Sequence, residues 1–167
     1  GLNIAVQKYR DHEKYVVISG YAGSGKTTLV RFLIEALDVE EDKVAYATFT
    51  GKAAEVLRKK GNKNAMTLHK LLYDSFPRPG GGFYRKPKTF LEYTIIVVDE
   101  VSLVPKSMIE MLNRHKAFII YIGDPGQLPV INKEEAHDLL TKPDIFLDQI
   151  MRQAQESEII RLTMKIR

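Results

Sequence analysis

Short apolar runs alternate along the chain with stretches whose apolar residues recur at helical spacing. The apolar runs predict buried strands, because every side chain in them is acceptable to a core. These runs are Tyr15 to Ile18, Val44 to Phe49, Thr94 to Val98 and Ala117 to Ile122. We also expect a short strand over Asp144 to Asp148.

The stretches between the predicted strands indicate amphipathic helices, each with one apolar face. The predicted helices cover Gly1 to Arg10, Thr28 to Leu37, Lys52 to Lys60, Thr67 to Leu72, Pro105 to Asn113 and Met151 to Arg167, with an irregular one over Asn132 to Thr141. The inward-facing residues of the second are Leu29, Phe32, Leu33 and Ala36, and those of the third are Ala53, Ala54, Val56 and Leu57.

The segment from Phe76 to Tyr93 breaks this pattern, since its three prolines and the consecutive glycines Gly80 to Gly82 rule out a regular helix. We expect an insert at about 74–93 that forms an exposed ribbon or loop; as a hairpin, it would have its tip at the glycines. Its aromatic residues are interleaved with Arg and Lys, a combination that suits single-stranded nucleic acid, whose phosphates need cations and whose bases stack. A flexible surface loop explains the composition equally well.

The segment from Gly20 to Thr27 is a full match to the phosphate-binding loop pattern G-x-x-x-x-G-K-[ST], placed between a strand and a helix. Glycines let the backbone wrap around a phosphate and direct N–H groups at it, beside the positive end of a helix dipole. Lys26 would supply a cation for the β- and γ-phosphates, and the Thr27 hydroxyl would be a ligand for Mg²⁺. A Gly-rich turn with a surface lysine is disfavoured, because the loop and its flanks agree. The candidate nucleotide-binding residues are Gly20, Ala22, Gly23, Ser24, Gly25, Lys26, Thr27 and Thr28.

The third predicted strand ends in two carboxylates, Asp99 and Glu100, a pattern of the Walker B type. Asp99 would hold Mg²⁺, directly or through water, and Glu100 would orient and deprotonate the attacking water. Together with the phosphate loop, the pair indicates hydrolysis of a nucleotide rather than binding alone. Ser102 is expected to position these groups. The next strand leads to Asp124 and Gln127, which we expect to meet the γ-phosphate and the water.

The second predicted strand opens into its helix through Thr50, Gly51 and Lys52, which would place a hydroxyl, N–H groups and a cation at the carboxyl edge of the sheet. Open α/β folds bind ligands at that edge. A helix cap followed by a surface lysine explains the same residues. Thr67 would cap the next helix, and His69 within it would be either a partner for nucleic acid or substrate, or a hydrogen-bonded structural histidine.

The composition fits one globular domain and excludes a membrane span, a disulfide framework and a thiolate metal site. The chain of 167 residues is long enough to bury a core, and 44% hydrophobic with 28% charged residues is ordinary. The net charge of +4 permits a polyanionic partner without demanding one. No apolar run approaches the ~20 residues that span a bilayer. The lack of cysteine excludes a disulfide framework and a thiolate metal site, and fits a reducing cytoplasm.

Six segments in this order resemble the motifs of superfamily one DNA helicases, specifically the RecD-like and Dda-like branch that moves 5′→3′. GYAGSGKTT resembles motif I, TFTGKAAEVLR motif Ia, and TLHKLL a segment that follows it. VVDEVSLV resembles motif II, IGDPGQLPVI motif III, and DQIMRQAQESEIIRL motif IV, with Arg152 and Gln153 as its RQ pair. The resemblance covers nearly the whole chain. It implies an α/β P-loop NTPase of RecA-like fold, with a mostly parallel sheet, helices on both faces and all motif loops at one edge.

The resemblance also implies a role for each matching residue. Those implied to act on ATP are Lys26, Thr27, Asp99, Glu100, Gln127 and Arg152, and those implied to touch single-stranded DNA are Thr50, Gly51, Lys52, Thr67 and His69. Gln127 would couple the γ-phosphate to DNA, and Arg152 would contact that phosphate as two motor domains close. The insert at about 74–93 lies where this family carries its 1B subdomain, the hairpin or pin that separates strands, and here it is short.

We therefore expect residues 1–167 to form one RecA-like motor domain, the N-terminal domain 1A of a helicase that couples ATP hydrolysis to 5′→3′ movement on single-stranded DNA. ATP and Mg²⁺ would be its cofactors, and a second RecA-like domain of the same longer protein would complete the site. The glutamine that reads adenine in this family is expected ahead of Gly1. We expect the protein to act in the cytoplasm of a bacterial or phage-infected cell, without a membrane.

Two alternatives stay open from the residues. A non-unwinding DNA-dependent ATPase or translocase, part of a recombination or repair nuclease, would carry the same motifs. A P-loop small-molecule kinase or a nucleotide-binding regulator is a different class. Against the kinase, Glu100 and the loop with Asp124 and Gln127 are suited to activating water, and no lid for an acceptor substrate is evident. Stimulation of ATP hydrolysis by single-stranded DNA would separate these classes.

Overall fold

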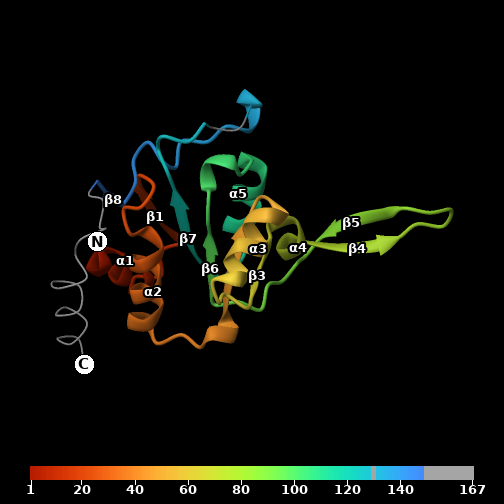
Figure 1. Cartoon of the computed structure of the whole chain (residues 1–167). Helices are drawn as coiled ribbons and strands as arrows, with labels where there is room; N and C mark the ends of the chain where they lie inside the picture. Colours follow the sequence, from red (N-terminus) through yellow and green to blue (C-terminus); the bar gives the residue numbers. More distant parts are fainter. Residues whose placement is uncertain (129–130, 149–167) are drawn as a thin grey trace.

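The computed structural model describes residues 1–128 and 131–148, and within them six strands form one parallel sheet. The strands are β1 (Tyr15–Gly20), β2 (Val44–Thr48), β3 (Ala65–Thr67), β6 (Ile95–Val98), β7 (Phe118–Gly123) and β8 (Ile145–Leu147). Their order across the sheet is β3-β2-β6-β7-β1-β8, and each neighbouring pair is parallel (Figure 1). The mostly parallel sheet expected from the sequence is confirmed.

Helices cover both faces of the sheet. They are α1 (Leu2–Arg10), α2 (Lys26–Leu37), α3 (Gly51–Lys59), α4 (Leu68–Leu72) and α5 (Lys106–Asn113), with 3₁₀ turns at Glu41–Lys43, Val101–Leu103 and Lys133–Glu135. α1 and α2 pack on one face, and α4 and α5 on the opposite face (Figure 1). α3 runs along β2 and β3, toward one end of the sheet. In the part of the chain that the structure describes, none of the helices is long and apolar enough to cross a membrane.

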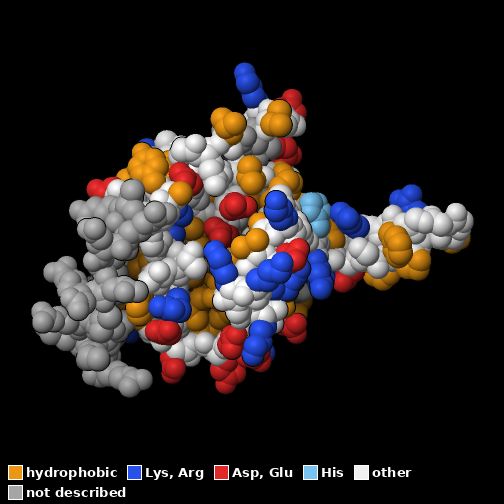
Figure 2. All heavy atoms as spheres, in the orientation of Figure 1, with side chains coloured by type: hydrophobic (Ala, Val, Ile, Leu, Met, Phe, Trp, Pro, Cys, Tyr) orange, Lys and Arg blue, Asp and Glu red, His pale blue; other side chains and the backbone are white. Residues whose placement is uncertain are grey.

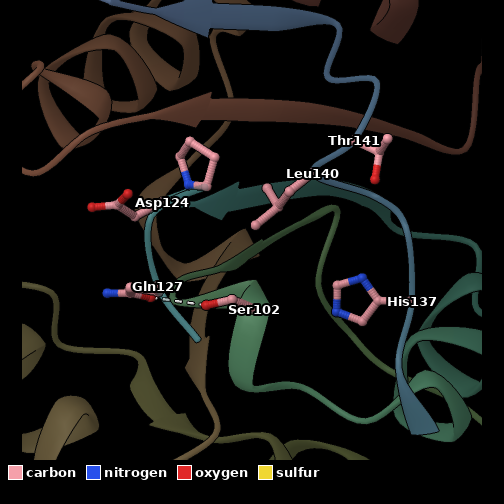
Figure 3. Close-up of a pocket in the computed structure, with 7 residues that line it drawn as sticks. Ser102, Asp124, Gln127, His137, Leu140 and Thr141 are labelled. Atoms are coloured by element: carbon pink, nitrogen blue, oxygen red, sulfur yellow. Dashed lines mark hydrogen bonds between the residues drawn. The ribbon is translucent and has the colours of Figure 1, made fainter. Parts of the chain in front are cut away.

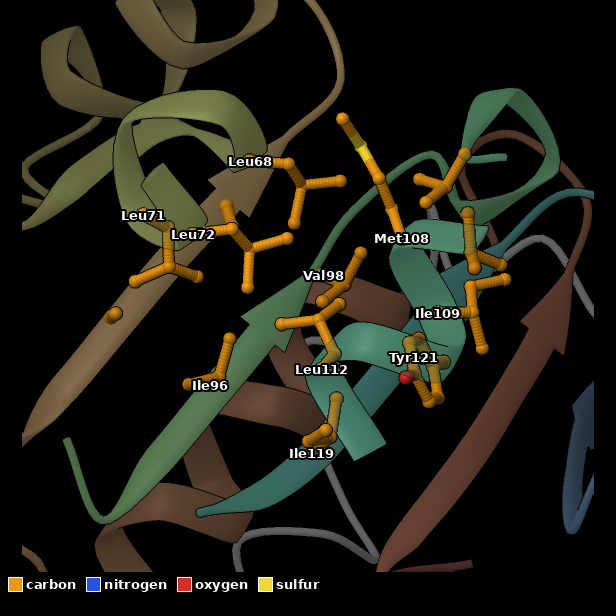
Figure 4. Packing of buried hydrophobic residues seen from close by; sticks show 14 of the residues in the cluster. Leu68, Leu71, Leu72, Ile96, Val98, Met108, Ile109, Leu112, Ile119 and Tyr121 are labelled. Carbon is orange, nitrogen blue, oxygen red and sulfur yellow. The ribbon is translucent and has the colours of Figure 1, made fainter. Parts of the chain in front are cut away.

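The strands are apolar throughout because the sheet is buried on both faces. Along β1, Val16 and Ile18 belong to the core beneath α1 and α2, whereas Val17 between them belongs to the core beneath α4 and α5. Figure 4 shows this second core, in which leucines of α4 and residues of α5 meet side chains of β6 and β7. Its labelled members include Leu68 and Leu112. Alternating side chains of one strand thus hold helices on both sides.

An antiparallel hairpin of β4 (Tyr73–Pro77) and β5 (Phe83–Pro87) projects away from the sheet beyond α4 (Figure 1). Its tip holds Gly80 to Gly82 with positive φ angles of 92°, 104° and 82°, a backbone region that glycine adopts without steric cost. The N–H of Lys88 donates to Leu72 O at 2.8 Å and ties the base of the hairpin to α4. Of the two forms expected for the insert, the structure has the hairpin with its tip at the glycines.

Two helices bury a different stripe from the one that the sequence pattern predicts. In α3 the buried residues are Ala54 and Leu57, and the prediction is wrong for Val56, which is 44% exposed. In α2 the buried residues are Leu29, Val30 and Leu33, while Phe32 and Ala36 are half-buried. Residues three or four positions apart share a helix face, so each helix turns one narrow stripe to the sheet and the neighbouring apolar residues lie at its margin.

The irregular helix predicted over Asn132 to Thr141 is absent apart from the 3₁₀ turn at Lys133–Glu135. The Glu135 carboxylate instead accepts hydrogen bonds from the N–H and the hydroxyl of Ser107, at 3.1 Å and 2.8 Å, and so fastens the segment to the start of α5. A tertiary contact outweighs a weak helical pattern here. β3 gives no signal in the sequence, because three residues are too short a run. The helix predicted over Met151 to Arg167 lies outside the described residues.

Candidate functional site

The loops that carry the candidate residues meet at the carboxyl edge of the sheet. β1 leads into the phosphate loop, β6 leads into Asp99 and Glu100, and β7 leads into Asp124 and Gln127. β2 leads into Thr50. Parallel strands that are neighbours in a sheet end at the same edge, so the structure brings together residues from four separate motifs.

The phosphate loop curls through Gly23 and Gly25, whose φ angles of 78° and 91° lie in the left-handed region. α2 starts at Lys26, and Gly25 in the N-cap position has no side chain with which to cap the helix. The first N–H groups of α2 are therefore left for an anion, which the helix dipole also favours. The Lys26 Nζ donates to Gly20 O at 2.6 Å and to Tyr21 O at 2.8 Å, so its positive charge lies against the loop.

Gly20 lies where the phosphate loop passes closest to β8. A Cβ on Gly20 would come within 2.6 Å of both the Leu147 carbonyl oxygen and the Ser24 hydroxyl oxygen, so only glycine fits this close approach. Ser24 is 2% exposed, and among the described residues its hydroxyl has no hydrogen-bond partner. A buried hydroxyl of this kind is normally satisfied, and a ligand on the loop would satisfy it.

Asp99 and Glu100 follow β6 with different backbone conformations. The Asp99 N–H donates to Ala47 O at 3.0 Å, which extends the sheet by one residue, and Asp99 Oδ1 accepts from the Glu100 N–H at 2.9 Å. Glu100 has φ 56° and ψ 44°, a left-handed conformation that costs a non-glycine residue about 1–2 kcal/mol. Strained residues of this kind collect at functional sites, where surrounding contacts hold them in place.

Burial raises the pKa of both carboxyl groups. For Asp99 the loss of hydration is the largest effect. It outweighs the hydrogen bond from Glu100 and the positive charges of Lys26 and Lys60, which lower the pKa. For Glu100 burial acts first, and the neighbouring charge of Asp99 raises the pKa further. Carboxyl groups with a raised pKa are candidates for proton transfer.

A cavity of about 320 Å³ lies next to the turn that follows Glu100. Its lining residues are Ser102, Asp124, Pro125, Gln127, His137, Leu140 and Thr141 (Figure 3). The Ser102 hydroxyl donates to Gln127 Oε1 at 2.8 Å, which joins this turn to the loop after β7. Asp124 Oδ1 accepts from the Gly126 N–H at 2.8 Å and shapes that loop. The positioning role expected for Ser102 thus has a contact to support it.

His137 is a residue of this cavity that the sequence analysis does not single out. Its ring nitrogen Nε2 lies 2.9 Å from the carbonyl oxygen of Val101, 36 positions earlier in the chain. Figure 3 shows the His137 ring and the Gln127 amide on opposite sides of Ser102. A lone histidine in an irregular segment gives no signal of such a contact in the sequence.

The candidate DNA-contact residues lie at the same edge, toward β2 and β3. Thr50 and Thr67 are helix N-caps, because each hydroxyl accepts a hydrogen bond at 3.2 Å from the N–H three residues later. The helix caps considered in the sequence analysis are thus present at both positions. Gly51 and Lys52 form the first turn of α3 and are exposed.

His69 is half-buried between the rings of Phe49 and Tyr73, with centroid distances of 5.9 Å and 6.2 Å. Burial lowers the pKa of His69, and the charge of Arg85 on the hairpin lowers it further. Both effects favour the uncharged form of the ring. This packing fits the structural explanation of His69, and it places the residue at the junction between the sheet and the hairpin.

Basic side chains gather beside these residues. Figure 2 shows Lys and Arg side chains clustered over α3 and near the base of the hairpin. On α3 they include Lys52, Arg58 and Lys59. On the hairpin the rings of Phe76 and Tyr84 stack at 5.4 Å, and the Lys86 Nζ lies 5.9 Å and 5.8 Å from their centroids. Cations and stacked aromatics are the two features that the sequence analysis associates with single-stranded nucleic acid.

Residues 1–128 and 131–148 hold no group of three or more His, Asp or Glu side chains that could bind a metal ion by themselves. Arg152, the last of the predicted site residues, lies outside the described residues.

A protein-family model described as "AAA domain" matches residues 3–167. The chain is 33% identical to uncharacterized protein R530 of Acanthamoeba polyphaga mimivirus, over 83% of the chain and 35% of that protein. It is 30% identical to the ATP-dependent RecD2 DNA helicase of Deinococcus radiodurans, over 89% of the chain and 21% of that protein. It is 28% identical to the ATP-dependent DNA helicase dda of Enterobacteria phage T4, over 80% of the chain and 32% of that protein. The chain thus spans about a third or less of the length of these relatives.

Solved structures of Pif1 helicases share the fold. Bacteroides Pif1 bound to single-stranded DNA matches with a TM-score of 0.57 at 24% identity, over 93% of this chain and 43% of that one. Pif1 of Bacteroides sp in complex with ADP-AlF4 matches with a TM-score of 0.59 at 22% identity, over 92% of this chain and 42% of that one. These structures confirm the RecA-like P-loop fold, and the curated relatives confirm the resemblance to RecD-like helicases that the motifs predict.

Proposed function

The chain belongs to the AAA domain family, and from this membership we propose that it is the ATP-hydrolysing motor domain of a DNA helicase. In this proposal, hydrolysis drives 5′→3′ movement on single-stranded DNA. The main support for this function is that three loops converge at one edge of the sheet: the phosphate loop, the Asp99–Glu100 pair and the Gln127 loop. The last two are joined by the hydrogen bond between Ser102 and Gln127. RecD2 and dda, both ATP-dependent DNA helicases by name, support it.

ATP would bind with its phosphates on the phosphate loop. The N–H groups of the loop and of the first turn of α2 would bind phosphate oxygens. Lys26 would exchange its contacts with Gly20 and Tyr21 for the β- and γ-phosphates. The buried Ser24 hydroxyl, which has no partner among the described residues, would gain one. The loop would therefore hold the phosphates mainly through its backbone.

Glu100 would orient a water molecule and accept its proton as the water attacks the γ-phosphate in line. Its pKa, raised by burial and by the charge of Asp99, makes its carboxylate a better proton acceptor. Lys26 would stabilise the charge that develops on the phosphate oxygens. Gln127 would contact the γ-phosphate through its amide N–H groups, because its amide oxygen already accepts from Ser102.

Asp99 and Thr27 fit a hard divalent cation such as Mg²⁺. One oxygen of the half-buried Asp99 carboxylate accepts from the Glu100 N–H, which leaves the other as a ligand, and the Thr27 hydroxyl is exposed on the first turn of α2. When bound, Mg²⁺ would offset the negative charge of the phosphates and orient them.

A second RecA-like domain would complete the ATP site, and Arg152 would contact the γ-phosphate as the two domains close. The relatives are much longer than the region that matches this chain, which supports a further domain in the whole protein. In this arrangement, Gln127 would pass the state of the γ-phosphate to the DNA surface. The isolated domain would bind ATP weakly, hydrolyse it slowly and unwind nothing.

Single-stranded DNA would cross the surface formed by α3, the start of α4 and the hairpin. The proposed contact residues are Thr50, Gly51, Lys52, Thr67 and His69. Lysines on α3 would neutralise phosphates, and the exposed N–H groups at the start of the helix would bind them as well. Bacteroides Pif1, which has the same fold, is bound to single-stranded DNA in its solved structure, and this supports single-stranded DNA as the partner.

ATP hydrolysis by the full-length protein, measured with and without single-stranded DNA, tests the proposal. DNA should stimulate hydrolysis, and Glu100→Gln should retain ATP binding while abolishing hydrolysis in both conditions. A duplex with a 5′ tail should be unwound, and one with a 3′ tail should not. Stimulation without unwinding would favour the translocase. Absence of stimulation would favour the kinase or regulator and would overturn the helicase assignment.

A further inference from the structure

His137 contacts the backbone of the turn that follows the proposed catalytic carboxylate, although it belongs to none of the motifs. Its Nε2 lies 2.9 Å from the Val101 carbonyl oxygen, and a carbonyl oxygen can only accept, so Nε2 carries the proton and donates. The other ring nitrogen, Nδ1, is buried and has no hydrogen-bond partner within the described residues. Within the described residues, the hydrogen bond to the Val101 carbonyl oxygen is thus the polar contact that the His137 ring makes.

Val101 directly follows Glu100 and is fully buried. Glu100 has a left-handed φ of 56°, and the chain then closes a tight turn. In this turn the Leu103 N–H donates to Glu100 O and the Val104 N–H donates to Val101 O, both at 3.0 Å. The Val101 carbonyl oxygen therefore accepts two hydrogen bonds, one from its own turn and one from His137. The conformation of Glu100 depends on how firmly this turn is held.

The same turn is held a second time at the next residue, where the Ser102 hydroxyl donates to Gln127. Gln127 and His137 both come from the chain that follows β7. They line one cavity together with Ser102 (Figure 3). Two side chains from beyond β7 thus bond consecutive residues of the turn that follows Glu100.

We propose that His137 is a positioning residue for ATP hydrolysis: its hydrogen bond to Val101 holds Glu100 in the left-handed conformation that directs the carboxylate at the attacking water. This inference rests on the proposed function and adds a residue to it. A left-handed glutamate is strained and persists only where neighbouring contacts hold it. Without the His137 donor, Glu100 would relax toward the common backbone regions and its carboxylate would move off the water.

The test compares His137→Ala with His137→Gln in the full-length protein. Alanine removes the donor, whereas the glutamine amide nitrogen reaches about as far as Nε2 and donates to the same oxygen. With single-stranded DNA saturating, His137→Ala should lower kcat about tenfold, the effect of one lost positioning hydrogen bond, with the KM for ATP within about twofold of the wild type. His137→Gln should recover most of kcat.

His12→Asn is the matched control, because His12 is exposed, lies away from the motif loops and has a positive φ that Asn tolerates. It should match the wild type in every measurement. Amide hydrogen exchange gives a second readout that does not depend on hydrolysis. In His137→Ala the amides of Leu103 and Val104, which close the turn, should exchange faster, and in His137→Gln they should keep wild-type protection.

Unchanged kcat and unchanged exchange in His137→Ala would overturn the proposal. A loss of kcat that glutamine does not restore, accompanied by an equal loss of ATP binding, would also overturn it, because that result marks a general loss of structure. A wild-type protein that does not hydrolyse ATP would refute the proposed function instead. The exchange of Leu103 and Val104 would then decide by itself whether His137 holds the turn.

Discussion

The hydroxyl of Ser102 donates a 2.8 Å hydrogen bond to Oε1 of Gln127, 25 positions later in the chain. The bond sets the orientation of the Gln127 amide: its oxygen accepts from Ser102, so its two N–H donors point away from the serine. In the proposed mechanism, these donors contact the γ-phosphate. A single hydrogen bond therefore joins the turn that follows Glu100 to the loop that meets the phosphate.

Ser102→Ala should slow hydrolysis more than it weakens ATP binding. Without the hydroxyl, the Gln127 amide can rotate, and a hydrogen bond of this kind contributes about 0.5–1.5 kcal/mol, roughly a two- to tenfold change in rate. The kcat of the full-length protein with saturating single-stranded DNA should fall by that factor, while the Kd for ATP stays within about twofold of the wild type. Tyr121→Phe, which removes another hydrogen-bonded hydroxyl, the one that donates to Asn113 Oδ1 at 3.0 Å, is the control. Equal kcat values in the two variants would show that the Ser102 bond plays no part.

Gly20→Ala should loosen the phosphate loop and the edge strand β8 together. The added methyl group would lie 2.6 Å from Leu147 O and from Ser24 Oγ, so the strand or the loop must move. Overpacking of this kind costs about 1–3 kcal/mol. Urea denaturation should show a lower midpoint with an unchanged slope, and the affinity for ATP should fall as well.

Gly51→Ala is the matched control for stability, because a Cβ on Gly51 would meet nothing within 4 Å and the residue begins α3. Alanine at that position should be neutral or slightly stabilising. If Gly20→Ala and Gly51→Ala had the same midpoint, the close approach of β8 to the loop would be ruled out as the reason for glycine at position 20.

Local spacing was enough to predict the strands of the parallel sheet other than β3, the phosphate loop and the side chains at the sheet edge. Lys26, Asp99 and Gln127 each stand in a loop that follows an apolar strand, and parallel strands carry such loops to one edge. Those residues are far apart in the sequence, but no long-range contact has to be known to place them together. For the insert, the three consecutive glycines predict where a hairpin would have its tip, but the sequence leaves a hairpin and a flexible loop equally open.

The features that the sequence does not predict depend on contacts between distant segments. His137 reaches Val101 across 36 positions, and Glu135 is fastened to Ser107 rather than placed in a helix. The exposure of Val56 depends on how α3 lies along β2 and β3, which the periodicity of the helix itself cannot show. Contacts of this kind follow from how the helices, strands and loops pack together, and the pattern of residues within one segment does not show that packing directly.

Acidification should destabilise the domain partly through His115, which lies between α5 and β7 and is 8% exposed. Burial lowers the pKa of His115, and the charge of Lys14 lowers it further, so the pKa in the folded state lies below the ordinary value of 6.5. The unfolded state then binds the proton more readily than the folded state. Stability that is fully present above pH 6.5 is therefore lost as the pH falls below that value.

Urea denaturation at about pH 7.5 and about pH 5.5 measures this effect. His115→Gln should lose less stability between the two pH values than the wild type, because it has no proton to bind. His12→Asn, at an exposed position, should lose as much as the wild type. An identical loss in His115→Gln would assign the pH dependence to other groups, among them His69, whose pKa is also lowered.

Phe76 on β4 and Tyr84 on β5 are cross-strand partners whose rings stack at 5.4 Å. Phe76 is 39% exposed, and the Lys86 Nζ lies within 5.9 Å of both ring centroids. An exposed aromatic pair with a cation beside it can stack on a base and neutralise a phosphate at the same time. If the chain binds single-stranded DNA as proposed, the hairpin would therefore offer it a second contact surface beyond α3.

Phe76→Ala should weaken binding of single-stranded DNA to the full-length protein by about 1–3 kcal/mol, roughly five- to 150-fold in Kd, the contribution of one base stacked on an aromatic ring. Lys86→Gln should instead reduce the slope of log K against log salt by about one, because one phosphate contact is lost. Fluorescence anisotropy over a salt series measures both quantities. Phe90→Ala is the control, since Phe90 is 71% exposed but lies outside the hairpin. Equal Kd values for Phe76→Ala and Phe90→Ala would remove the hairpin from the DNA-binding surface and leave α3 and the start of α4 to form it.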